Sequence, residues 1–136
     1  MQHETQIEVR YFETDGQGIV HHANYFPYFE LARIRLLAAA GLEYAELERQ
    51  GVFLVVHSIS CRYHLPALFG DTLRIVTIVE KASPARIDHS YRVLRDDDLL
   101  AEGKSTIACV NGEGVVQRIP DFILNVRIPD QPPPLA

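Results

Sequence analysis

Residues 25–40 are the most apolar stretch of the chain and constrain its fold more than any other segment. The charged positions in this stretch are Glu30, Arg33 and Arg35. Asn24 is a suitable N-cap for a helix, and Pro27 falls in the first turn, where its missing N–H is not needed. Gly41 is a suitable residue just beyond the helix end. The pattern therefore predicts one long helix between Asn24 and Gly41.

The predicted helix is apolar nearly all round, so it must be largely buried. Glu30 and Arg33 are three residues apart, and we expect them to pair on one helix face. A helix of this kind needs wide covering, so a sheet should curl around it. Its outer rim should meet another subunit. We therefore expect a homodimer or a homotetramer.

Strand patterns surround this helix. Residues 5–12 alternate, which places Ile7, Val9 and Tyr11 on the buried face of a first strand. Further strand patterns follow the helix, at residues 52–65, 71–81, 85–95 and 99–110. Neighbouring strands are separated by short turns, which indicates antiparallel pairing. We predict an α+β fold in which a curved antiparallel sheet of about five strands wraps around the helix in two layers.

Two smaller elements complete the prediction. A second short helix is expected at about residues 43–50, ending near Gly51. Residues 122–128 are expected to add a short strand or a turn. We assign residues 1–128 to one domain and residues 129–136 to a Pro-rich tail without regular structure.

The bulk properties exclude several classes of protein. The chain has 136 residues, the size of one domain, and its net charge of −5 argues against nucleic-acid binding. Residues 1–8 lack the features of a signal peptide, and no apolar run of about 18 residues could span a membrane.

Cys61 and Cys109 lie in apolar runs and are expected to be free thiols. A disulfide or a reactive cysteine stays open as the alternative. Two free thiols would fit a reducing cytoplasm.

The segment before the helix differs from ordinary core packing. Asp15 lies in a loop with two glycines, and His21 and His22 precede the helix start. A helix N-terminus offers unpaired N–H groups and a partial positive charge. Such a position favours an anion, including the oxyanion of an acyl-transfer intermediate. Taken alone, however, Asp15-Gly16 is also a common turn pair.

Four short motifs lie between Tyr11 and Arg33, namely Thr14-Asp15, Gly18-Ile19-Val20, His22-Ala23-Asn24-Tyr25 and Phe29-Glu30-x-Ala32-Arg33. With this spacing the segment resembles the 4-hydroxybenzoyl-CoA thioesterase family of hotdog-fold proteins, in particular its YbgC-like branch. The predicted strand order matches the hotdog order over about residues 4–111. Gln17 departs from the small residue usual in the family, which affects the loop and not the catalytic position.

The resemblance implies an acyl-CoA thioesterase in which Asp15 is the catalytic carboxylate. A thiol has a pKa of about 8.5 and leaves readily, so the enzyme needs a base or nucleophile and oxyanion stabilisation. Direct attack by Asp15 and activation of a water both stay open. By resemblance, Tyr11 assists the acid and His22 is the active-site histidine. The ordinary alternatives are a core tyrosine and a helix-capping or exposed histidine.

Neighbouring residues receive other roles. His21 is expected to face away from the site, and Asn24 to cap the helix. By position Lys81 and Arg86 resemble the region where the family holds the CoA nucleotide, so they are candidates for phosphate contacts. Solvated strand-end charges are the alternative for these two residues. No spacing here resembles a zinc site, and no cofactor is expected because CoA is part of the substrate.

The acyl group is expected to be a short aliphatic or an aromatic one, although the aromatic residues near the helix start are also good core residues: Tyr25, Phe26, Tyr28 and Phe29. An acyl carrier protein could replace CoA without a change in chemistry.

A hotdog hydratase would need a differently placed histidine and acid, and a non-catalytic acyl-CoA-binding protein would not need Tyr11, Asp15 and His22 together. The chain has no Gly-x-Ser-x-Gly motif, which argues against an α/β-hydrolase.

Overall fold

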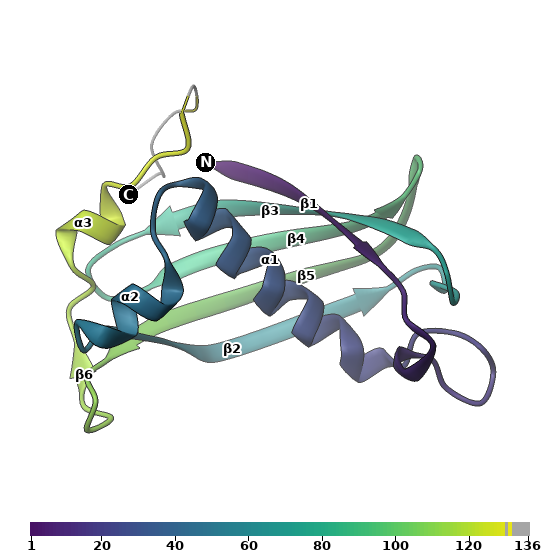
Figure 1. Ribbon diagram of the computed structural model, residues 1–136, viewed down its shortest axis with the longest axis horizontal. Helices are drawn as coiled ribbons and strands as arrows, with labels where there is room; N and C mark the ends of the chain where they lie inside the picture. The colour runs from purple at the N-terminus through teal and green to yellow at the C-terminus, as the bar shows by residue number, and fades with distance from the viewer. Residues whose placement is uncertain (130, 132–136) are drawn as a thin grey trace.

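The computed structural model describes residues 1–129 and 131. Its helices and strands, in chain order, are β1 (Gln2–Glu8), η1 (Tyr11–Glu13), η2 (His22–Asn24), α1 (Tyr25–Ala39), α2 (Tyr44–Arg49), β2 (Phe53–Tyr63), β3 (Thr72–Ala82), β4 (Ile87–Arg95), β5 (Asp98–Val110), β6 (Val116–Gln117) and α3 (Asp121–Leu124). The strands form one antiparallel sheet in the order β1-β3-β4-β5-β2, and β6 pairs with β5. Helix α1 lies across one face of the sheet (Figure 1). The predicted α+β architecture is confirmed.

Both predicted ends of helix α1 are close to the observed ones. Asn24 occupies the N-cap position, but its side chain does not cap the helix, and its amide donates instead to the carbonyl of Glu13 at 2.7 Å. At the other end Gly41 has a φ of +89°. The N–H of Leu42 donates to the carbonyl of Leu37 at 2.8 Å, which closes the helix with a Schellman-type bond.

The helix is buried along the face that meets the sheet, at Tyr25, Tyr28, Phe29, Ala32, Leu36 and Leu37. The predicted Glu30–Arg33 ion pair is wrong. The guanidinium of Arg33 turns toward the sheet and donates to the Tyr91 hydroxyl at 3.0 Å, whereas Glu30 stays exposed. No ion pair between Glu30 and Arg33 occurs in the described part of the chain.

Phe29 brings helix α1 into direct contact with the sheet. Its ring is fully buried and stacks on Tyr91, with 4.4 Å between ring centroids. Gly103 lies directly opposite Tyr91 in the β4–β5 ladder, and a Cβ atom at position 103 would overlap the Phe29 ring. A glycine on β5 is therefore what lets the helix sit this close to the sheet.

The first strand differs from its prediction. It spans Gln2–Glu8 and ends before Tyr11, which lies in the 3₁₀ turn η1 with 71% of its surface exposed. The expectation that Tyr11 points into the core is therefore wrong. The physical reason is Glu13, whose carboxylate accepts from the backbone N–H of Arg10 at 2.8 Å and turns the chain out of the strand.

The other boundaries agree with the predictions to within a few residues, with one exception near the C-terminus. Residues 121–124 form a short helix, α3, where a short strand or a turn was predicted for residues 122–128. The two cysteines are free thiols, as expected, with Cys109 buried and Cys61 partly buried. The predicted irregular tail, residues 129–136, lies outside the described residues except for Pro129 and Gln131. None of the described helices is long and apolar enough to cross a membrane.

The inner face of the sheet carries buried polar side chains beneath α1, at Thr77, His89 and Ser105. His89 lies opposite Val79 on β3 and opposite Ser105 on β5. Burial, together with the positive charge of Arg33, lowers the pKa of His89 to about 3. His89 is therefore a neutral imidazole inside the fold at neutral pH.

We predict that Gly103→Ala lowers the free energy of unfolding by about 1–3 kcal/mol, the usual cost of overpacking a core. Urea unfolding followed by circular dichroism measures the change. Gly112→Ala is the control, because the nearest atom to a Cβ there lies 3.8 Å away on Phe53. Equal stability of the two variants would contradict the packing described for Phe29.

Stability should also depend on the protonation of His89. An unfolded histidine has a pKa of about 6.5, so between pH 6.5 and about 3 the unfolded chain binds a proton that the folded chain does not. The free energy of unfolding should fall as pH falls through this window, by up to about 1.4 kcal/mol per pH unit. His89→Gln should lose most of this dependence, whereas the exposed His57→Gln should keep it. Parallel pH profiles for the wild type and His89→Gln would refute the assignment.

Candidate active site

Asp15 opens a tight turn between η1 and η2. Its N–H donates to the carbonyl of Ile19 at 2.8 Å, and its carbonyl accepts from the N–H of Gly18 at 3.0 Å. Its carboxylate oxygen Oδ1 accepts from the N–H of Gln17 at 2.8 Å. The turn role that the sequence left open is thus present. The second oxygen, Oδ2, has no hydrogen-bond partner among the described residues, so it is available to another group.

Asp15 lines a groove of about 390 Å³ together with residues from three segments: Ile19 and Val20 from the loop, His22 and Tyr25 from the helix start, and Tyr63, His64, Leu65 and Pro66 from the end of β2. The predicted pair Asp15 and His22 therefore lies in one groove. Of the aromatic residues near the helix start, Tyr25 lines this groove, while Tyr28 and Phe29 are core residues.

The backbone at the helix start leaves one donor unpaired among the described residues. The N–H of His21 donates to the Glu13 carbonyl at 2.9 Å, and the N–H of Ala23 donates to Nδ1 of His21 at 3.1 Å. The N–H of His22, which begins η2, has no acceptor among the described residues. An unpaired N–H at a helical N-terminus suits a developing negative charge.

The two histidines lie side by side. Their rings stack with 4.2 Å between centroids, and His21 is outside the groove lining while His22 is part of it. His21 therefore lies outside the groove, as expected, although its ring stacks on that of His22. The His22 ring makes no hydrogen bond to Asp15 in the described part of the chain.

Tyr63 belongs to the site and was missed from sequence. Its hydroxyl donates to the carbonyl of His22 at 2.8 Å, and its ring meets that of Tyr25 edge-on at 5.2 Å. Burial, followed by the neighbouring Cys61, raises the pKa of Tyr63 to about 12, so the hydroxyl stays a donor at neutral pH. The alternation of residues 52–65 placed Tyr63 on a strand face but could not show its partner 41 residues away.

Glu13 is the second residue that sequence reasoning missed. It is buried, and its carboxylate accepts from the hydroxyl of Tyr28 at 3.1 Å. Burial and the adjacent Glu13 carboxylate raise the pKa of Tyr28. The Glu13 carbonyl accepts from the N–H of His21 and from the side chain of Asn24. Glu13 thereby ties the Asp15 loop to the start of α1.

Three predicted site residues do not line the groove of Asp15. The Tyr11 ring packs edge-on against Phe69, at 5.7 Å, and is not part of the groove lining. Lys81 and Arg86 flank the turn between β3 and β4. Asp15 adjoins the opposite end of β3, since Ile19 bridges to Leu68, so these two residues lie roughly 30 Å away at about 3.3 Å per strand residue. Arg86 also pairs with Asp88 at 3.4 Å.

Comparison with known proteins identifies the family of the chain. Residues 9–127 match the family described as the Thioesterase-like superfamily. A putative esterase from Aquifex aeolicus is 35% identical over 87% of this chain and 91% of its own length. The acyl-CoA thioesterase YbgC of Haemophilus influenzae is 31% identical over 77% of this chain and 78% of its own.

The fold is also that of solved relatives. The crystal structure of a hypothetical protein from Thermus thermophilus superposes with a TM-score of 0.85 and 40% identity, covering 88% of this chain and 92% of that one. The curved antiparallel sheet around α1 is the hotdog fold that the resemblance implied. The chain therefore belongs to the thioesterase-like superfamily and, within it, to the YbgC-like thioester hydrolases.

Proposed function

We propose that this chain hydrolyses a short aliphatic or aromatic acyl-CoA to the free acid and CoA in the groove of Asp15. One observation carries the proposal: Asp15, whose Oδ2 is unpaired, and His22, whose backbone N–H is unpaired, are described residues that line the same groove. The Haemophilus relative is named an acyl-CoA thioesterase, which supports the substrate class. The reaction needs neither a metal nor a cofactor. The two free thiols suit a reducing compartment, so we place the activity in the cytoplasm.

The groove supplies the two functions that thioester hydrolysis requires. The His22 N–H donates to the carbonyl oxygen of the thioester as it becomes an oxyanion. Asp15 then acts by one of two routes. It attacks the carbonyl carbon, so that the C–S bond breaks and an anhydride forms for water to open, or it takes a proton from the water that attacks. In both routes CoA leaves as a thiolate, which needs little help from an acid.

We further propose that two copies pair through β2, as a dimer or as the unit of a tetramer. β2 is an edge strand of eleven residues, with exposed apolar side chains at Val55, Val56 and Tyr63. An open apolar edge of this length calls for a partner strand. Two-fold pairing of β2 with its copy is antiparallel, so it brings the far end of the partner's sheet beside the Asp15 groove.

The dimer would resolve the position of the CoA candidates. Lys81 and Arg86 lie at the far end of the sheet from Asp15 in one chain. In the paired sheet the same two positions of the second copy come to the groove end. They would lie roughly 15–20 Å from the seam, at about 4.8 Å per strand. This distance suits the phosphates of CoA, which are remote from the thioester sulfur.

Asp15→Asn should lower turnover by at least about a hundredfold, because the amide is neither a base nor a nucleophile. The asparagine Oδ1 can still accept from the Gln17 N–H, so the turn and the unfolding midpoint should be retained. Release of free thiol from a panel of acyl-CoAs measures the rate and also identifies the acyl group. A variant as fast as the wild type would refute the role of Asp15.

Val56→Glu should convert the assembly to monomers, since two carboxylates would meet near the paired edges. Sedimentation or light scattering measures the mass. Val116→Glu is the matched control, because Val116 is exposed but lies on β6, outside the β2 edge. A wild-type protein that is already monomeric, or a Val56→Glu variant with unchanged mass, would contradict the proposed pairing.

A further inference from the structure

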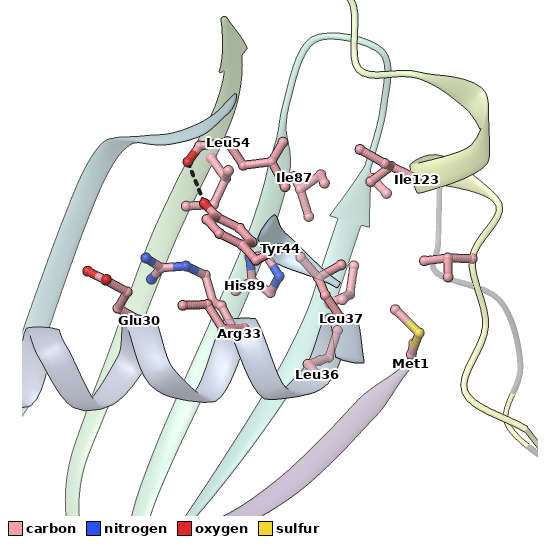
Figure 2. Close-up of a pocket in the computed structure, with 15 residues that line it drawn as sticks. Met1, Glu30, Arg33, Leu36, Leu37, Tyr44, Leu54, Ile87, His89 and Ile123 are labelled. Atoms are coloured by element: carbon pink, nitrogen blue, oxygen red, sulfur yellow. Dashed lines mark hydrogen bonds between the residues drawn. The ribbon is translucent and has the colours of Figure 1, made fainter. Parts of the chain in front are cut away.

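A second cavity lies between the latter half of α1 and the sheet, and it has no lining residue in common with the Asp15 groove. Figure 2 shows that its two ends differ in character. Glu30, Arg33 and His89 gather toward one end, and the opposite end is lined by apolar side chains such as Leu37 and Ile123. The cavity is therefore amphiphilic, and so should be any molecule that fills it.

His89 brings an unused hydrogen-bonding group to this cavity. The residue is 7% exposed, and its Nδ1 has no hydrogen-bond partner among the described residues. Its cross-strand neighbour Ser105 bonds to the hydroxyl of Tyr91, and no hydrogen bond joins Ser105 to His89 among the described residues. A buried nitrogen without a partner is costly, and a ligand atom that bonds to it would remove that cost.

Arg33 brings a positive charge to the same end. Its Nη1 donates to the Tyr91 hydroxyl, which is neutral. Within the described part of the chain no carboxylate lies within 4.0 Å of the guanidinium. Glu30 lines the cavity but remains exposed, so its carboxylate stays hydrated. Arg33 therefore has further N–H donors and no anionic partner, which is the condition for binding a carboxylate from outside.

We propose that this cavity binds a short monocarboxylic acid, with its carboxylate on Arg33 and on the Nδ1–H of His89 and its carbon chain against Leu37, Ile87 and Ile123. The size of the cavity limits the chain. At 40 Å³, and with roughly 10–15 Å³ needed for one water-sized group, it holds about three or four such groups. The three carbons that butanoate carries beyond its carboxylate fit this limit, with the carboxylate at the Arg33 end of the cavity, beside the exposed Glu30. One guanidinium beside an exposed glutamate suits a single negative charge better than a phosphate.

Calorimetric titration with butanoate and with butan-1-ol tests the role of the charge. The wild type should bind butanoate saturably. Arg33→Gln removes the charge but retains an amide donor for Tyr91, and it should weaken butanoate binding by about tenfold or more. Its effect on butan-1-ol should be less than about threefold. Arg35→Gln is the matched control, since Arg35 bonds to Thr5 and to the Gln6 carbonyl outside the cavity, and it should leave both titrations unchanged.

Methyl NMR of isoleucine-labelled wild-type protein locates the binding without any variant. The methyl signals of Ile87 and Ile123, which line the cavity, should shift with butanoate, and the signal of Ile19 reports separately on the Asp15 groove. The proposal is overturned if butanoate does not saturate, if the signals of Ile87 and Ile123 do not shift, or if Arg33→Gln binds as the wild type does. None of these readouts depends on turnover, so a failure here and a failure of the proposed hydrolysis are separable.

Discussion

The rest of the structure depends on the packing of α1 against the concave face of the sheet, and above all on Phe29. Its ring occupies the space that Gly103 leaves and stacks on Tyr91. This contact sets how close the helix lies to β4 and β5. Arg33, one turn further along the helix, reaches the same Tyr91. A glycine on a strand thus lets the helix pack closely against the sheet between the two candidate sites.

A buried carboxylate adds the second constraint. Glu13 lies two residues before Asp15, and both its carboxylate and its carbonyl bond to residues at the start of the helix. A charged group in the core is stable only when such partners surround it. The consequence is that the loop of Asp15 is attached to the start of the central helix, which suits a carboxylate that must hold its place.

Sequence reasoning succeeded where the signal was local. The ends of α1, the antiparallel strands and the approach of Asp15 to His22 follow from caps, alternation and a short connecting loop. It failed where a partner far along the chain decides the outcome. Tyr11 leaves the strand because Glu13 turns the chain, and Arg33 leaves Glu30 because the sheet offers Tyr91. Tyr63 needed knowledge of which strand ends beside the helix start. The distance of Lys81 and Arg86 from Asp15 likewise depends on the direction of β3. That distance can be derived only when the order of all strands in the sheet is known.

The position of Tyr63 has a thermodynamic consequence. The residue ends the open edge strand and also donates to the carbonyl of His22. Any molecule that pairs with this edge therefore restricts the motion of the residue that borders the groove. Association at the edge and occupancy of the groove are then linked equilibria, and linkage is reciprocal. Pairing at the edge and binding in the groove would each lower the entropic cost of the other. Dilution that separates the proposed pair would therefore also change how well the groove is formed.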